Sequence, residues 1–124
     1  MPLVLIVDDN EKNRKLARDV LSTAGFRTSE AATGAVAIAL AVESVPDVIL
    51  LDLGLPDMSG TEVARQLKSG ERTARIPLVA LSALSLQEGG DWLEAAGFAG
   101  WVEKPIRVGT FPDQVRRYCV KGGR

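Results

Sequence analysis

Histidine is absent from the 124 residues, and cysteine occurs only once, at Cys119. Without histidine, the chain cannot form a Ser-His-Asp triad or a zinc site that uses imidazole ligands. A single thiol provides neither a disulfide within the chain nor a set of thiolate ligands for zinc. Any catalytic chemistry in this protein must therefore use carboxylates, hydroxyl groups and lysine.

Neither sign of charge is in excess, because 15 Lys and Arg residues are balanced by 16 Asp and Glu residues for a net charge of -1. This balance provides no excess of positive charge that would bind nucleic acid or anionic lipid. We interpret Arg107, Arg116 and Arg117 as solvated side chains. No apolar run approaches the ~20 residues of a membrane span, and the N-terminus lacks the layout of a signal peptide. We expect a cytoplasmic protein that binds neither nucleic acid nor a membrane directly.

The hydrophobic fraction of 46% and the charged fraction of 25% are typical of a globular protein, and the length suffices for a single core. The sequence contains no linker, internal repeat or low-complexity segment. We therefore predict that residues 1–124 form one domain without an effector domain.

Apolar runs of strand length recur along the chain, at Leu3–Val7, Val48–Leu51, Leu78–Leu81 and, more weakly, Gly100–Val102. Their hydrophobicity is continuous rather than alternating, which is typical of parallel strands buried on both faces. The segment Arg27–Ala31 is a candidate for a fifth strand at the edge of the same sheet.

Helical patterns separate these strands. Asn10 and Thr33 are the predicted N-caps of the first two helices, whose apolar stripes include Leu16 and Leu21 in the first helix and Ala41 and Val42 in the second. Three more helices are expected before Gly70, from about Trp92 and after Thr110. The alternation of strand and helix, repeated five times, predicts an α/β fold in which helices cover both faces of a doubly wound parallel sheet.

Polar residues follow the strands, at the sheet edge where such folds bind their ligands. They carry three carboxylates, a hydroxyl group and an ammonium group, on Asp8, Asp9, Asp52, Ser82 and Lys104. Three acids that meet at one edge repel one another unless a cation joins them. Because Mg²⁺ prefers oxygen ligands, the pattern predicts a magnesium site at this edge.

Such a site suits phosphoryl transfer. Asp52 ends an apolar strand, where a buried carboxylate is costly, and its presence there is explained if it is the attacking nucleophile. Ser82 would donate a hydrogen bond to a phosphoryl oxygen, and Lys104 would offset the charge of that group. Taken singly, each residue also has a structural explanation, such as a helix-entry turn, a loop hydroxyl group or a solvated charge.

The segments VDDN, LLDLGLPDMSG, ALSA and EKP contain these residues in a specific order and spacing. Over essentially the whole chain, they resemble the receiver domain of bacterial two-component response regulators. The resemblance implies a flavodoxin-like fold with five parallel strands in the order 2-1-3-4-5. It also implies that Asp52 accepts a phosphoryl group from a phosphohistidine on a histidine kinase or on a histidine phosphotransfer protein.

The resemblance assigns the site residues in more detail. It implies that Mg²⁺ is held by Asp9, Asp52 and the backbone carbonyl of Gly54, with Asp8 behind these direct ligands. The serine and the lysine at the strand ends would contact the phosphoryl group. The peptide bond before Pro105 would be cis, a state that only X-Pro bonds adopt at low cost.

Trp101, three residues before Lys104, has the position of the family's switch aromatic, which acts together with Ser82. Core packing is the alternative explanation for this tryptophan. The resemblance implies that phosphorylation switches the binding of a partner protein to the face formed by the fourth helix, the fifth strand and the last helix. We expect a monomer or a weak homodimer.

Other classes of protein fit the sequence less well. A flavin-binding module needs a phosphate-cradling loop rich in Gly, Ser and Thr after the first strand, where this chain has DDNEKN. A haloacid-dehalogenase-like phosphatase would place a second Asp two residues after its nucleophile, where this chain has Asn10. A degenerate receiver, which binds proteins without being phosphorylated, stays open as the alternative, although all five site residues are present.

Overall fold

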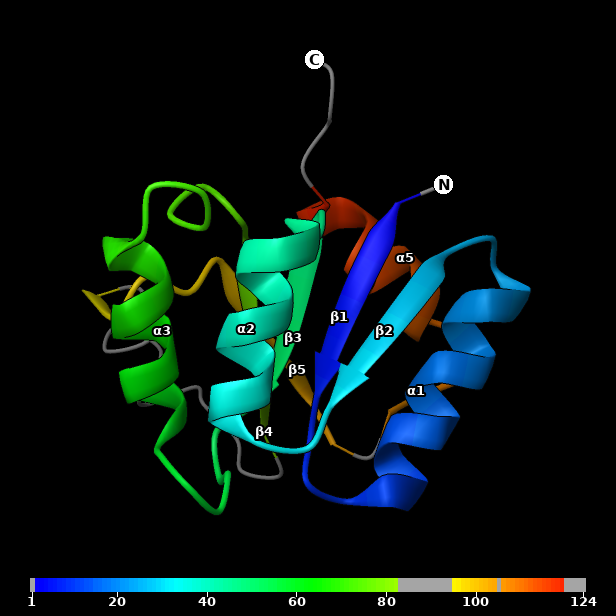
Figure 1. Ribbon diagram of the computed structural model, residues 1–124. Coiled ribbons are helices and arrows are strands. Elements are labelled where there is room, and N and C mark those ends of the chain that lie inside the picture. The colour runs from blue at the N-terminus through cyan, green and yellow to red at the C-terminus, as the bar shows by residue number, and fades with distance from the viewer. Residues whose placement is uncertain (1, 83–94, 105, 120–124) are drawn as a thin grey trace.

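Five strands form one parallel sheet in the computed structural model, which describes residues 2–82, 95–104 and 106–119. The strands are β1 (Leu3–Val7), β2 (Arg27–Ala31), β3 (Val48–Asp52), β4 (Leu78–Ser82) and β5 (Gly100–Glu103). Their order is β2-β1-β3-β4-β5, and all neighbouring strands run in parallel (Figure 1). The predicted fold class, the strand order and the edge strand at Arg27–Ala31 are confirmed.

Helices α1 (Glu11–Thr23), α2 (Gly34–Ser44) and α3 (Gly60–Ser69) connect the strands from β1 to β4, and α5 (Phe111–Tyr118) follows β5. The side chain of Asn10 accepts a hydrogen bond from the amide of Asn13 at 3.0 Å, and Thr33 accepts one from Val36 at 3.2 Å. Both predicted N-caps are therefore confirmed, because each satisfies an amide that the first helical turn leaves free.

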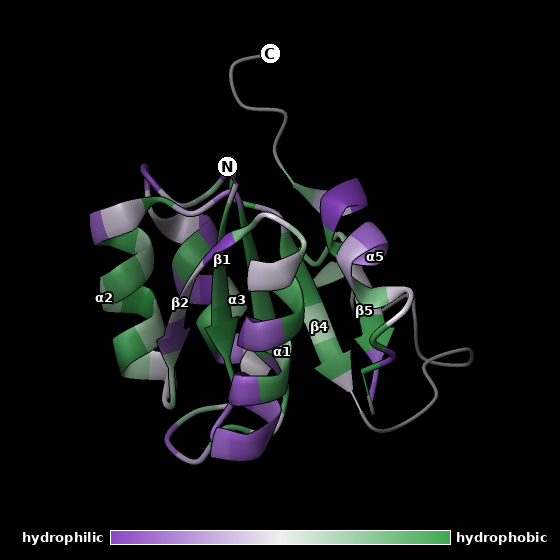
Figure 2. Ribbon diagram, turned by 90° about the vertical axis from the view of Figure 1, so that its right-hand side faces the viewer, coloured by the Kyte–Doolittle hydropathy of each residue, from purple (hydrophilic) through white to green (hydrophobic). Residues whose placement is uncertain are grey.

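The sheet is buried on both faces, as the continuous apolar runs predicted. One face packs against α2 and α3 through residues such as Leu5 and Leu51, and the other packs against α1 and α5 through Val4 and Leu50. Successive residues of a strand point to opposite faces, so the three central strands β1, β3 and β4 each supply both cores. Figure 2 shows β1 and β4 mostly in green, the hydrophobic colour, with purple, hydrophilic segments on α1, on α5 and along the edge strand β2.

The prediction that Leu16 and Val42 face the core is wrong. Leu16 is 38% exposed and Val42 is 45% exposed, and the core positions of their helices are held by Ala17 in α1 and Ala41 in α2. Each alanine stands one residue from the misplaced side chain, about 100° around the helix. Ala41 was part of the predicted apolar stripe of its helix, whereas Ala17 was not predicted, and the small side chains let these helices lie close to the sheet.

Some predictions fall on residues 83–94 or 105, outside the described residues. They are the loop Ala83–Gly90, the fourth helix from about Trp92 and the cis peptide bond before Pro105. None of the helices in the described part of the chain has the length and hydrophobicity to span a membrane. The prediction of one domain without an effector domain stays a prediction.

Candidate functional site

Three carboxylates meet at the edge of the sheet where the parallel strands end. Asp8 and Asp9 follow β1, and Asp52 is the last residue of β3, the strand next to it. Oxygen atoms of the three side chains lie within 4.8 Å of one another. Asp8 is fully buried, Asp52 is partly buried and Asp9 is exposed, so the cluster opens to solvent on one side. The structure thus brings together the three acids that sequence analysis placed at this edge.

Lys104 completes the cluster from the end of β5. Its Nζ lies 3.0 Å from Oδ2 of Asp8 and 3.3 Å from Oδ2 of Asp52, so one ammonium group bridges two carboxylates. Burial acts to lower the pKa of Lys104, but the contacts with Asp8 and Asp52 outweigh it and raise the pKa above its ordinary value. Lys104 is therefore protonated at neutral pH. Three carboxylates against one ammonium leave two negative charges uncompensated in the cluster.

Backbone amides fix the orientation of two of the carboxylates. Oδ1 of Asp8 accepts a hydrogen bond from the amide of Asn10 at 2.9 Å, and Oδ1 of Asp52 accepts one from Gly54 at 3.0 Å. A Cβ atom at Gly54 would lie 3.9 Å from Oδ1 of Asp52, an ordinary contact distance. Because Gly54 has no side chain, it does not cover this side of the Asp52 carboxylate.

The donor set suits a hard divalent cation. Oδ2 of Asp8 is buried, and Nζ of Lys104 lies 3.0 Å from it as an ion-pair partner. One ammonium cannot balance three converging carboxylates, and a bound cation would offset the remaining repulsion. Together with Asp9 and Asp52, Asp8 forms a set of negatively charged oxygen ligands of the kind that Mg²⁺ prefers.

Ser82 and Trp101 lie on neighbouring strands. Ser82 is the last residue of β4, is buried, and pairs in register with Glu103, whereas Trp101 pairs with Ala80 near the start of β5. The two residues are therefore diagonal neighbours on one face of the sheet, the face to which Ala80 belongs. Trp101 is 40% exposed, which disfavours the alternative that it serves only to fill the core.

The loop that follows Asp52 is attached to α2 by a residue that sequence analysis missed. The carboxylate of Asp57 accepts hydrogen bonds from the amides of Gly34 at 2.8 Å and Ala35 at 3.0 Å. These bonds hold the pKa of Asp57 below its ordinary value, and the bond from Gly34 has the largest effect. Asp57 thus binds the positive N-terminal end of α2, 23 residues earlier in the chain, and no local signal indicates that contact.

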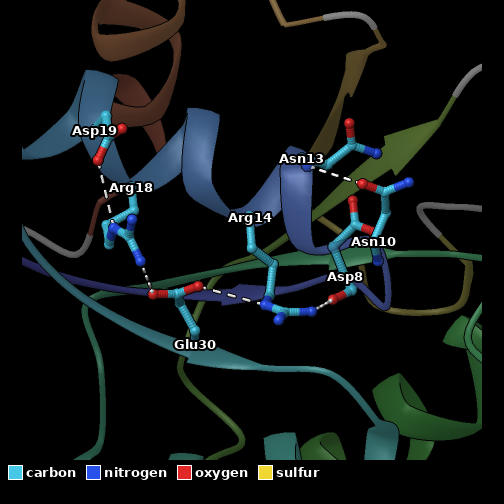
Figure 3. A network of polar contacts seen from close by, with 7 residues as sticks. All are labelled: Asp8, Asn10, Asn13, Arg14, Arg18, Asp19 and Glu30. Carbon is cyan, nitrogen blue, oxygen red and sulfur yellow. Dashed lines mark hydrogen bonds and ion pairs between the residues drawn. The ribbon is translucent and has the colours of Figure 1, made fainter.

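A second missed contact supports the turn between β1 and α1. Nη1 of Arg14 donates to the backbone carbonyl of Asp8 at 2.8 Å, and its Nε lies 3.3 Å from Oε1 of Glu30 on β2. The other oxygen of Glu30 accepts from Nη1 of Arg18 at 3.0 Å (Figure 3). The network connects the edge strand, the first helix and the backbone of a site residue.

A parallel sheet of this order, with an acidic pocket and a lysine at the carboxyl ends of its strands, defines the receiver class of signalling proteins. Residues 4–116 match the model of the response regulator receiver domain, and the chain belongs to this family. It is a receiver of two-component signalling and not a classical enzyme. The expected family is thus confirmed.

Relatives of similar length are known. The polar-differentiation response regulator DivK of Brucella ovis is 37% identical over 115 residues, which cover 93% of this chain and 94% of DivK. The chemotaxis protein CheY4 of Vibrio cholerae superposes with a TM-score of 0.89 at 30% identity, covering 95% of this chain and 98% of the other.

One similar structure contains a metal ion in its active-site cleft. The receiver domain of a sensor histidine kinase from Pseudomonas aeruginosa was solved with a magnesium ion coordinated in its active-site cleft. It is 27% identical to this chain, with a TM-score of 0.84, and the match covers 94% of this chain and 96% of the other. An acidic cluster such as Asp8, Asp9 and Asp52 is typical of the magnesium site of receivers.

Proposed function

We propose that Asp52 accepts a phosphoryl group from a phosphohistidine and that the resulting acyl phosphate switches the binding of a partner protein. One carboxylate oxygen of Asp52 attacks phosphorus, and a new O–P bond forms as the P–N bond to the donor imidazole breaks. The donor nitrogen keeps the bonding electron pair and takes up a proton. The observation that carries the proposal is the convergence of three acids and Lys104 at one edge of the sheet. Asp52 lies there at the end of its strand and is partly exposed to solvent.

The surrounding residues have separate roles in this proposal. Asp9, Asp52 and the backbone carbonyl of Gly54 hold Mg²⁺, and Asp8 lies behind them with its buried carboxylate oriented by Asn10. When bound, Mg²⁺ supplies positive charge that offsets the charge of the phosphoryl oxygens. Lys104 supplies a second positive charge from the end of β5, at the same edge of the sheet, and is already in contact with Asp52.

The donor in the proposal is a histidine kinase or a histidine phosphotransfer protein. The chain contains no histidine, so it can accept a phosphoryl group from a phosphohistidine but cannot form a phosphohistidine itself. Membership of the receiver family supports a histidine kinase system as the source of the phosphoryl group. A cytoplasmic location, the absence of direct binding to nucleic acid or membrane, and a monomer or weak homodimer stay predictions.

The first prediction concerns covalent modification. Incubation with acetyl phosphate and Mg²⁺ should add one phosphoryl group to the protein, since acetate is a good leaving group and no partner protein is needed. Hydroxylamine should remove this group, because an acyl phosphate is attacked at its carbonyl carbon. Intact-protein mass spectrometry before and after hydroxylamine measures both results.

An Asp52→Asn variant is the control for that experiment. The amide is nearly the same size but is a poor nucleophile, so the variant should show no hydroxylamine-sensitive adduct. A stable adduct on Ser82 would assign a different nucleophile. A wild-type protein that binds Mg²⁺ but is never modified would favour the degenerate receiver, which acts without phosphorylation.

The proposed output face includes β5 and α5. A groove of about 500 Å³ lies there, and charged side chains of both signs line it, among them Glu103, Arg107, Asp113 and Arg117. Lys104 also lines this groove, so the same residue reaches both the acidic cluster and the proposed partner surface. The contribution of the fourth helix lies outside the described residues.

The second prediction concerns how the phosphoryl group changes this face. Ser82 should move toward the phosphoryl oxygens, and Trp101, its diagonal neighbour on the same face of the sheet, should then change rotamer. The fluorescence of Trp101 should shift during titration with beryllofluoride and Mg²⁺. The measurement uses a Trp92→Phe background so that only one tryptophan reports.

Ser82→Ala in the same background is the matched control, because it removes the hydroxyl group and retains the backbone pairing with β5. The fluorescence change should be lost in this variant. If Trp101 gives the same signal with and without bound beryllofluoride, it has no part in the switch. If the change persists in Ser82→Ala, the tryptophan responds by a route that does not include Ser82.

A further inference from the structure

Arg14 contacts the acidic site through the backbone and not through a carboxylate. Its Nη1 donates to the carbonyl oxygen of Asp8 at 2.8 Å, while its Nε pairs with Glu30 at 3.3 Å (Figure 3). The side chain of Arg14 is only 18% exposed, and that of Glu30 is 28% exposed. Two contacts made by different nitrogens of one planar guanidinium fix its position more firmly than either contact alone.

The carbonyl of Asp8 lies at the point where β1 ends and the turn into α1 begins. On one side of this residue, its amide donates to the carbonyl of Ala31 on β2 at 3.1 Å. On the other side, its Oδ1 accepts from Asn10 at 2.9 Å. Arg14 supplies the remaining backbone contact, so Asp8 is held at its amide, its carbonyl and its carboxylate. The turn that carries Asp8 and Asp9 is therefore fixed relative to β2 and α1.

We propose that Arg14, held by Glu30, is a positioning residue for the acidic site. It fixes the backbone of Asp8. It thereby fixes the distances from the carboxylates of Asp8 and Asp9 to the carboxylate of Asp52. The proposal rests on the proposed function, because it treats these carboxylates as the surroundings of bound Mg²⁺. Partners that orient metal ligands commonly change metal affinity by about tenfold or more when they are removed.

The direction in which the Mg²⁺ affinity changes distinguishes a positioning role of Arg14 from an effect of its charge alone. A positive charge near a cation site disfavours binding of the cation, so loss of the Arg14 charge alone would tighten the binding of Mg²⁺. Loss of positioning would weaken it, because the carboxylates would no longer be held at a fixed separation. We expect weakening, which the loss of charge cannot produce.

Arg18 provides a matched control on the same helix. It also pairs with Glu30, at 3.0 Å, but its other contact is with Asp19 and not with the site. Arg18→Gln therefore removes one positive charge and one ion pair with Glu30, as Arg14→Gln does. Only the latter removes the hydrogen bond to the carbonyl of Asp8.

The experiment titrates Mg²⁺ into wild-type protein, Arg14→Gln, Arg14→Lys and Arg18→Gln by calorimetry at constant ionic strength. We expect the Kd for Mg²⁺ to rise about tenfold in both Arg14 variants and to change less than about twofold in Arg18→Gln. Arg14→Lys keeps the charge but loses the planar fork that spans two partners. An unchanged or tighter Kd in Arg14→Gln, an equal rise in Arg18→Gln, or full retention of affinity in Arg14→Lys would overturn the proposal.

A measurement on metal-free protein makes the result independent of Mg²⁺. Amide hydrogen exchange at Asp8 and Asn10 should become faster in Arg14→Gln than in Arg18→Gln, while the melting temperatures of the two variants stay similar. Uniformly faster exchange would indicate general destabilisation and contradict a local role. Wild-type protein that does not bind Mg²⁺ would count against the proposed function, and the exchange result would still decide the role of Arg14.

Discussion

Replacement of Lys104 with methionine should lower the rate of phosphorylation by acetyl phosphate by about a hundredfold or more, the usual cost of removing one preorganised positive or hydrogen-bonding group. In the present structure, the ammonium already lies 3.3 Å from Oδ2 of Asp52, so its positive charge stands next to the carboxylate that would accept the phosphoryl group. The binding of Mg²⁺ should be retained or become tighter, because a competing positive charge is removed. Stopped-flow or quench kinetics give the rate, and calorimetry gives the Kd.

The same variant should be less stable in the absence of metal. Without Lys104, the fully buried Asp8 loses its ion pair, and three carboxylates face one another with no cation between them. Millimolar Mg²⁺ should restore much of the lost melting temperature. The raised pKa of Lys104 means that its stabilising contribution is present at neutral pH and is lost only as the pH rises through that raised value, above the ordinary range for lysine.

Lys68→Met is the matched control for this prediction. Lys68 is also partly buried, but its ammonium donates to the backbone carbonyls of Ala74 and Ile76 at 3.0 and 3.1 Å, and burial lowers its pKa. Its loss should reduce stability without changing the phosphorylation rate or the response to Mg²⁺. Equal losses of rate in the two variants would mean that Lys104 acts only through stability.

The strands could be predicted from sequence because a parallel strand that is buried on both faces leaves a run of apolar residues with no polar interruption. The segment Leu3–Val7 has the same bounds in the structure, and the runs from Val48 and Leu78 extend by one residue to include Asp52 and Ser82. The core-facing side of α2 was harder to predict. This helix is apolar almost all round, so periodicity does not select one face, and small alanines hold the core positions.

The site was partly predictable for a topological reason. All five strands end at one edge, so residues that follow the strands gather there whatever the details of packing. The contacts among them were not predictable. That Lys104 bridges Asp8 and Asp52, and that Arg14 and Asp57 hold the adjoining turn and loop, depends on side-chain geometry between residues far apart in the chain. Spacing in the sequence gives no measure of such distances.

Substitution of Asp52 with asparagine should raise the melting temperature of the metal-free protein. The cluster holds three carboxylates and one ammonium, and the removal of one charge halves its net excess of two negative charges while leaving the pair between Lys104 and Asp8 in place. A gain of about 1 kcal/mol would raise the melting temperature by about 4 °C for a domain of this size. Calorimetry in buffer with a chelator measures the effect.

Mg²⁺ should stabilise the wild-type protein and should do so less in Asp52→Asn, since the variant loses a charged ligand. A metal concentration ten times the Kd adds about 1.4 kcal/mol, which is well within the range of a melting experiment. Asp47→Asn is the matched control, because Asp47 accepts a hydrogen bond from the amide of Leu3 at 2.7 Å, where β1 begins, at the other end of the strand from the acidic cluster. This control should not be stabilised, and its response to Mg²⁺ should equal that of wild type. If neither Mg²⁺ nor Asp52→Asn moves the transition, the three carboxylates do not act as one site.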